Sequence, residues 1–271
     1  MLAPIKDWDD AFANMAYAPG AEALPDIWTT DAADYRASVS VEVDISYGDA
    51  SREKLDIVWP EGTPKGLAVF IHGGYWMRFD KSFWTHFAEG ARALDWAVCL
   101  PGYTLAPEAR ISHMTRQMGA AVTLAASRVA GPICLTGHSA GGHLATRLMC
   151  ADGPLDATTR QKIVRAMSIS GLHDLRPLMH TKLNDVLHLD AAEAASESPA
   201  LLTPAAPIPF TCWVGGGERP EFIRQSQLLV QMWEGLDVPT ECRIDAEHNH
   251  FTVIEGLKTP TSPITKAFVG L

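Results

Sequence analysis

The chain has 271 residues and a formal net charge of −10 at pH 7, and 47% of its residues are hydrophobic. This length fits one α/β domain spanning residues 1–271. An acidic chain lacks the basic patches that bind nucleic acids or anionic membranes, so we expect neither as a partner. No segment is apolar enough to span a bilayer, and we expect no signal peptide. Five scattered cysteines favour a reduced, cytoplasmic protein.

Strand and helix patterns alternate along most of the chain. Residues 1–38 are predicted to be irregular, with a short helix near residues 8–15, and are a candidate cover for the site. Apolar runs predict strands at residues 40–47, 55–59, 67–72, 97–101, 132–136, 166–170, 210–214 and 240–244. Helices are predicted at residues 81–94, 114–129, 143–151 and 221–234. This order indicates a mixed, mostly parallel sheet of about eight strands with helices on both faces. Residues 187–209 are predicted to form either an ordinary surface connection or a flap.

A G-x-S-x-G pattern occupies residues 137–141, between a predicted strand and a predicted helix. A serine in that setting can sit on a strained turn that lifts its hydroxyl out of the sheet. The flanking glycines let the backbone turn tightly and let the helix pack close to the strand. The pattern therefore predicts Ser139 as a nucleophile.

A second candidate loop is His72-Gly73-Gly74-Tyr75-Trp76, directly after a predicted strand. Acyl transfer creates an oxyanion, and backbone N–H groups next to glycines are open to a substrate oxygen. In α/β hydrolases a loop of this type supplies one donor, and the residue after the nucleophile supplies another. The expected oxyanion hole is therefore Gly73 or Gly74 together with Ala140.

A serine hydrolase of this fold also needs an acid and a late histidine, in the chain order Ser, acid, His. The late histidines are His248 and His250, which could also suggest a metal site, but no third histidine or cysteine lies nearby in sequence. We therefore expect no metal. The acid candidates are Asp174 and Glu218, and the position of Glu218 after the penultimate predicted strand favours it.

Several segments resemble the α/β-hydrolase kynurenine formamidases, or arylformamidases. Residues 72–76 are similar to the HGGxW signature of that family, and residues 137–142, 214–226 and 250–255 are similar to further segments. The resemblance implies Ser139 as nucleophile, Glu218 as acid and His250 as base, because the family histidine directly precedes a Phe. The acid in that family is more often Asp, and Glu218 reaches one methylene further.

Residues 103–108 (YTLAPE) resemble a segment of the hormone-sensitive-lipase-like carboxylesterases, which usually carry a third glycine where this chain has Tyr75 and Trp76. The aromatic pair is expected to narrow the pocket and to bind a flat aryl substrate, although packing against the following helix is an alternative for one of the two.

These observations predict a serine hydrolase that needs no cofactor and acts on a small molecule, most simply N-formylkynurenine, a formamide of tryptophan catabolism. A carboxylesterase or thioesterase acting on small acyl groups is the alternative. A catalytically silent hydrolase-fold protein that binds a ligand is a third reading. The patterns specify no oligomeric state.

Overall fold

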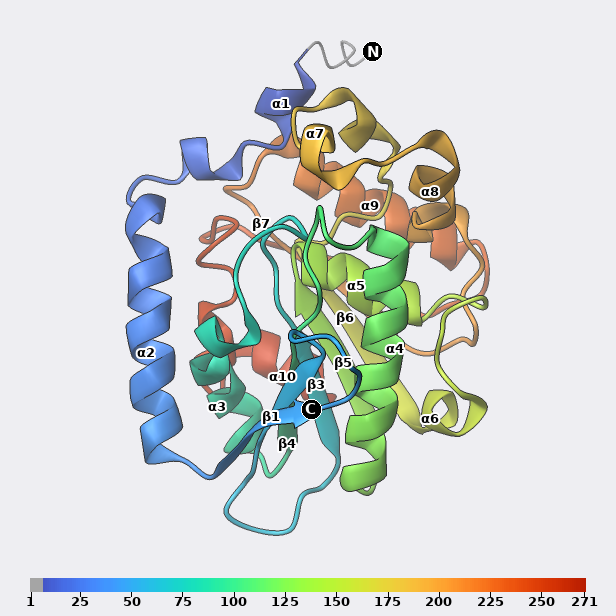
Figure 1. Cartoon of the computed structure of the whole chain (residues 1–271). Helices are drawn as coiled ribbons and strands as arrows, with labels where there is room; N and C mark the ends of the chain where they lie inside the picture. The colour runs from blue at the N-terminus through green and yellow to red at the C-terminus, as the bar shows by residue number, and fades with distance from the viewer. Residues whose placement is uncertain (1–6) are drawn as a thin grey trace.

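The computed structural model describes residues 7–271, and its centre is an eight-stranded sheet (Figure 1). The strands, in chain order, are β1 Val41–Ser46, β2 Lys54–Val58, β3 Leu67–Ile71, β4 Ala97–Pro101, β5 Ile133–His138, β6 Ile163–Ile169, β7 Phe210–Gly215 and β8 Thr240–Asp245. Their order across the sheet is β1-β2-β4-β3-β5-β6-β7-β8. The β1–β2 and β2–β4 pairs are antiparallel, and the other pairs are parallel. The predicted mixed, mostly parallel sheet is confirmed, with small shifts at the strand ends.

Helices cover both faces of this sheet. The α-helices are α1 Trp8–Ala11, α2 Leu24–Ser38, α3 Glu89–Arg92, α4 Ile111–Arg128, α5 Ala140–Leu148, α6 Ala157–Lys162, α7 Asn184–Leu187, α8 Ala191–Ser196, α9 Pro220–Glu234 and α10 Pro263–Val269. The 3₁₀ helices are η1 Asn14–Tyr17, η2 Ala21–Ala23, η3 Lys81–Phe83, η4 Thr85–Ala88, η5 Arg176–His180, η6 Pro199–Leu201 and η7 Glu255–Lys258. Apolar side chains of α4, α5 and α9 share one core with the sheet, and those of α2, α3 and α10 share a second core. In Figure 1, α2 and α4 accordingly lie on opposite sides of the molecule.

The central strands β3, β4 and β5 are largely apolar in sequence, which suits the middle of the sheet. All five residues of β3 and of β4 are buried, as is every residue of β5. Strands of a parallel sheet covered on both faces have no solvent side, so they lack the polar alternation of half-exposed strands. The edge strands β1 and β8 are half-exposed and do show polar positions.

Two expectations about helices were wrong. The N-terminal segment is not irregular, since α2 forms a 15-residue helix within it. Its only buried side chains are Trp28 and Ala32, one turn apart, and so narrow an apolar stripe gives little periodic signal. The helix predicted at residues 81–94 is broken into η3, η4 and α3, because Trp84 has φ −119° and ψ 4°, outside the helical region.

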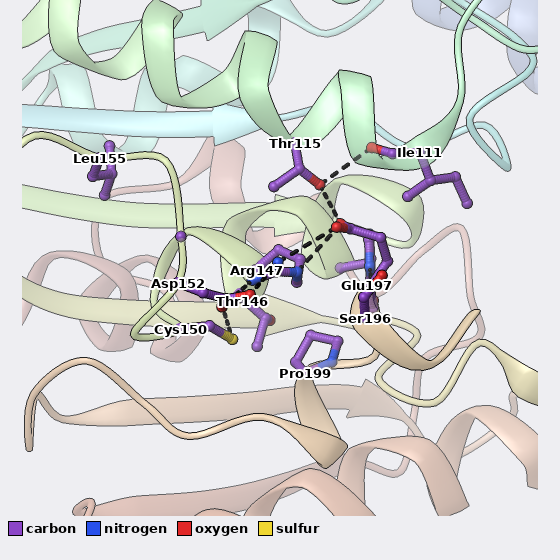
Figure 2. Close-up of polar contacts among 12 residues, drawn as sticks. Ile111, Thr115, Thr146, Arg147, Cys150, Asp152, Leu155, Ser196, Glu197 and Pro199 are labelled. Carbon is purple, nitrogen blue, oxygen red and sulfur yellow. Dashed lines mark hydrogen bonds and ion pairs between the residues drawn. The ribbon is translucent and has the colours of Figure 1, made fainter. Parts of the chain in front are cut away.

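Residues 187–209 contain α8 and η6 and are tied to α4 and α5 by hydrogen bonds (Figure 2). The Glu197 carboxylate accepts hydrogen bonds from Thr115 on α4 at 2.7 Å and from Nε of Arg147 on α5 at 3.2 Å. Both members of the Glu197–Arg147 ion pair are buried. The segment is thereby fixed against the helix that begins directly after Ser139.

Parallel strands end at one edge of the sheet, and this places the candidate loops together. Ile71, the last residue of β3, pairs with Gly137 on β5, and His138 pairs with Ile169 at the end of β6. On the other side, Gly215 at the end of β7 pairs with Asp245 at the end of β8. The loops after these five strands therefore emerge side by side, as binding loops of open α/β sheets do.

Candidate active site

Ser139 lies on a strained turn between β5 and α5. Its backbone has φ 56° and ψ −118°, an uncommon conformation for a residue with a side chain. The neighbouring glycines allow this turn, since a Cβ at Gly137 would lie 2.2 Å from the carbonyl oxygen of Gly141. A Cβ at Gly141 would lie 1.9 Å from the carbonyl oxygen of Ile71. The chain thus holds the Ser139 side chain at the sheet edge, at the N-terminus of α5.

His250 is paired with Glu218. The Nδ1 atom of His250 lies 2.6 Å from Oε2 of Glu218, and the Glu218 side chain is fully buried. The other carboxylate oxygen accepts hydrogen bonds from the Gly215 main-chain N–H at 2.7 Å and from the Ser170 hydroxyl at 2.5 Å. With Nδ1 donating to the carboxylate, Nε2 is the basic nitrogen of the imidazole.

The competing acid and the competing histidine have other partners. Asp174 accepts from Nε of Arg176 at 2.8 Å and pairs with it as an ion pair. His248 contacts the hydroxyl of Thr252 at 3.2 Å through Nδ1. Of the sequence-predicted candidates, the structure brings His250 and Glu218 together.

The glycine run before Glu218 explains how its loop reaches the histidine loop. The Gly217 N–H donates to the carbonyl oxygen of His248 at 2.9 Å. A Cβ at Gly215 would lie 2.5 Å from that same oxygen, so a larger residue would push the two loops apart. The histidine loop is also held by His138, whose Nε2 donates to the carbonyl oxygen of His250 at 2.8 Å. Burial, together with the neighbouring His250, holds the pKa of His138 well below its usual range.

The Gly73–Gly74 loop lies against the nucleophile turn. A Cβ at Gly73 would lie 3.1 Å from Cβ of Ser139, and Gly74 has φ +116°, which favours glycine. Ala140 is the first residue of α5, so its N–H has no intrahelical acceptor. Tyr103 steadies the strand end by donating to the carbonyl oxygen of His72 at 2.9 Å.

Tyr75 and Trp76 have different roles. Tyr75 lines the cavity beside Ser139, and its hydroxyl donates to the carbonyl oxygen of Phe12 at 2.5 Å. Trp76 is fully buried and packs edge-on against His143, with 5.2 Å between ring centroids. The expectation that Trp76 lines the substrate pocket is corrected, because its ring belongs to the core and is absent from the cavity wall in the described part of the chain.

Ser139 and His250 both line a cavity of about 580 Å³. Six aromatic residues contribute to its walls: Phe12, Trp28, Tyr75, Phe79, Trp84 and Phe251. Residues of the N-terminal segment contribute to the wall: Asp9, residues 12–15 and Trp28. Lys182, Leu183 and Val186 also line the cavity, whereas no residue of 187–209 does within residues 7–271. The cavity wall is therefore shared between the N-terminal segment and the residues around Lys182.

Sequence reasoning missed two residues that hold the catalytic candidates. Ser170 donates to Glu218 from the end of β6, with its own backbone at φ 52°. His138 fixes the carbonyl of His250. Ser170 ends a predicted strand and His138 is a variable position of the G-x-S-x-G pattern, and neither signal identifies the residue that the side chain contacts.

Comparison with known proteins agrees with this architecture. Residues 68–206 match a protein family described by its alpha/beta hydrolase fold. A kynurenine formamidase of Salmo salar is 30% identical over 228 residues, covering 79% of this chain and 76% of that protein. A kynurenine formamidase of Danio rerio is 29% identical over 241 residues, covering 85% and 82%.

Solved structures show the same fold. A candidate thioesterase from Silicibacter sp. TM1040 is 44% identical, covers 97% of this chain and 99% of its own, and superposes with a TM-score of 0.92. Esterase B from Lactobacillus rhamnosis is 17% identical with a TM-score of 0.67, covering 94% and 91%, and shares the fold. The chain belongs to the α/β-hydrolase family and is a hydrolase. No helix among residues 7–271 is long and apolar enough to cross a membrane.

Proposed function

We propose that this hydrolase is an aryl formamidase that converts N-formylkynurenine to kynurenine and formate through Ser139, Glu218 and His250. The observation that carries the chemistry is the 2.6 Å contact between His250 and the buried Glu218, because His250 lines the same cavity as Ser139. The choice of a formamide is supported by the named activity of the Salmo salar and Danio rerio relatives. The aromatic walls of the cavity suit a flat aryl group.

The acylation half of the reaction follows from these positions. His250 Nε2 takes the proton of Ser139 as the serine oxygen attacks the formyl carbon. The resulting oxyanion is held by the N–H of Ala140 and by that of Gly73 or Gly74. The carbon–nitrogen bond then breaks, and protonated His250 gives its proton to the departing aniline nitrogen.

Deacylation repeats these roles with water. Water attacks the formyl ester of Ser139 while His250 takes one of its protons, and the collapse of the intermediate returns a proton to Ser139 and releases formate. An aryl amide is easier to cleave than an alkyl amide, because the ring shares the nitrogen lone pair. A triad of esterase type is therefore sufficient for this substrate.

Hydrolysis of a small ester or thioester is the second candidate function. It is favoured by the 44% identity to the candidate thioesterase of Silicibacter sp. TM1040. The decisive measurement compares kcat/KM for N-formylkynurenine, p-nitrophenyl acetate and a short acyl-CoA. We expect the formamide to be the best of the three. A formamide turnover far below the ester turnover would replace the formamidase proposal with an esterase, and a preference for acyl-CoA would replace it with a thioesterase.

A further inference from the structure

Asn14 presents an unpartnered donor in the wall of the cavity. The residue is only 5% exposed and lines the same cavity as Ser139. Its Oδ1 accepts the Arg219 main-chain N–H at 3.1 Å, which fixes the amide orientation and makes the other atom Nδ2. Nδ2 has no hydrogen-bond partner within residues 7–271. Because leaving a buried polar group unpaired costs free energy, an acceptor from a bound ligand is expected at this atom.

The segment that carries Asn14 is held in place from outside the cavity. Arg219, next to Glu218, forms an ion pair with Asp10, and its guanidinium carbon lies 3.8 Å from the ring centroid of Tyr17. The donor of Asn14 is therefore preorganised by contacts with Arg219, on the loop that carries the candidate acid.

Two cations line the same cavity. Arg78 and Lys182 are exposed, and neither side chain forms an ion pair in the described part of the chain. The Arg78 main-chain N–H donates to the carbonyl oxygen of Gly74 at 3.0 Å, which ties Arg78 to the Gly73–Gly74 loop. Asp9 is the acidic member of the described lining, and its Oδ1 accepts the main-chain N–H of Lys182 at 2.7 Å.

We propose that Asn14, Arg78 and Lys182 form a subsite that recognises a carboxylate on the substrate, so that the preferred substrates are aryl acyl compounds bearing a carboxylate. The inference deepens the proposed function and rests on it, since it concerns the same cavity. A carboxylate satisfies both the amide donor and the unpaired cations, whereas a neutral carbonyl satisfies only the amide. Local positive charge is also needed to attract an anion to a protein with a net charge of −10.

The test uses two substrate pairs that differ only in this charge. The first pair is N-formylkynurenine and its carboxamide. The second is 3-(4-acetoxyphenyl)propanoate and 3-(4-acetoxyphenyl)propanamide, which are aryl esters. We expect the wild-type enzyme to favour the carboxylate member of each pair through a KM about 10-fold lower or more, as for hydrogen bonds to a charged group.

Three variants assign the preference to residues. Asn14→Asp keeps the oxygen that accepts from Arg219 but replaces the donor with a negative oxygen, so KM for the carboxylate substrate should rise most. Arg78→Met and Lys182→Met keep much of the side-chain stem and remove the charge. Lys266→Met is the matched control, because it removes an exposed cation of α10 outside the described cavity wall. It should leave kcat and KM unchanged for both members of each substrate pair.

The carboxamide substrates decide between binding and folding effects. The subsite predicts that Arg78→Met and Lys182→Met raise KM for the carboxylates while kcat and KM for the carboxamides stay near wild type. Asn14→Asp should raise KM by a larger factor for the carboxylates than for the carboxamides, because both can accept from the amide but only the carboxylate is repelled by the new charge. Equal losses on both members of a pair, or a wild-type enzyme without a preference, would overturn the inference. If N-formylkynurenine is not cleaved but the ester pair still shows the preference, the formamidase proposal fails and the subsite stands. A preference for acyl-CoA that depends on Arg78 would assign the cations to phosphate instead and would overturn it.

Discussion

Glu218 and His250 come from loops after adjacent strands and meet with 2.6 Å between carboxylate Oε2 and imidazole Nδ1. Both side chains are buried, and the second carboxylate oxygen is occupied by the Gly215 N–H and the Ser170 hydroxyl. The carboxylate is thus aimed at a single nitrogen, which sets the tautomer of His250 and leaves Nε2 as the basic nitrogen of the imidazole.

Replacing Glu218 should reduce the rate far more than replacing Asp174. Without the carboxylate, the imidazole loses the partner that orients it and stabilises its protonated form, so we expect kcat of Glu218→Ala to fall by about 10⁴-fold. Asp174→Ala removes only the partner of Arg176 and should leave kcat near wild type. The measurement is steady-state kinetics on the best of the three substrates. A comparable loss of kcat in both variants would contradict the assignment of the acid role to Glu218 alone.

Ser139→Ala should reduce kcat by about 10⁶-fold if nucleophile, base and acid act as one unit. A fluorophosphonate probe should label the wild-type enzyme and leave this variant unlabelled. Ser226→Ala, at another buried serine, is the control and should label normally. Labelling that persists in Ser139→Ala would assign the nucleophile to another residue.

The buried ion pair between Arg147 and Glu197 should matter for stability (Figure 2). Glu197→Ala leaves the buried Arg147 guanidinium with Asp152 as its remaining ion-pair partner, so it should lower the free energy of unfolding by about 3 kcal/mol, the lower end of the cost of breaking a buried pair. Glu42→Ala removes the partner of Arg128 in an exposed pair and should cost about 1 kcal/mol or less. Urea denaturation of the two variants measures both values. Equal costs would contradict a structural role of Glu197 in fixing α5.

Buried histidines should make the fold sensitive to acid. Burial lowers the pKa of His143 and of His173 to about 3 and the pKa of His86 to about 4, so all three are neutral in the folded protein at pH 5. In the unfolded chain they bind protons as the pH falls below about 6.5. Stability is therefore full above that pH and is lost as the pH falls toward the folded pKa values.

The expected slope is about 1.4 kcal/mol per pH unit for each such histidine between pH 6.5 and the folded pKa. Denaturant titrations at neutral pH and at about pH 5 measure the difference directly. An unfolding free energy that is unchanged between these two conditions would show that the histidines titrate normally in the folded state.

The strands and the motif loops were predictable because their signals are local. An apolar run long enough for a covered parallel strand is visible in β3, β4 and β5 without knowledge of any neighbour. Glycines that must accept a close backbone approach mark the turns at Gly137 and Gly215. Helix α2 was not predictable in the same way, since its buried face consists of two residues.

The cavity wall depended on contacts between segments far apart in sequence. Asp9, residues 12–15 and Trp28 line the cavity next to Ser139, and in Figure 1 α1 lies beside α7 at one end of the molecule. The pairing of Asn14 with Arg219 joins positions 205 residues apart. No periodicity or spacing encodes such a contact. Local sequence also does not encode the different positions of Trp76 and Tyr75. Trp76 packs against His143 in the core, whereas Tyr75 lines the cavity.

By itself the sequence determined the mixed, mostly parallel sheet, the position of Ser139 between a strand and a helix, and the order of the acid and histidine candidates. Each follows from hydrophobic pattern or from glycine at a turn, which act over a few residues. Only the tertiary structure decided that Glu218 rather than Asp174 faces His250, that Ser170 holds Glu218, and that an N-terminal loop places the free Asn14 donor in the cavity. These relationships depend on strand order and loop contact, because side chains that meet across the sheet edge belong to separate parts of the chain.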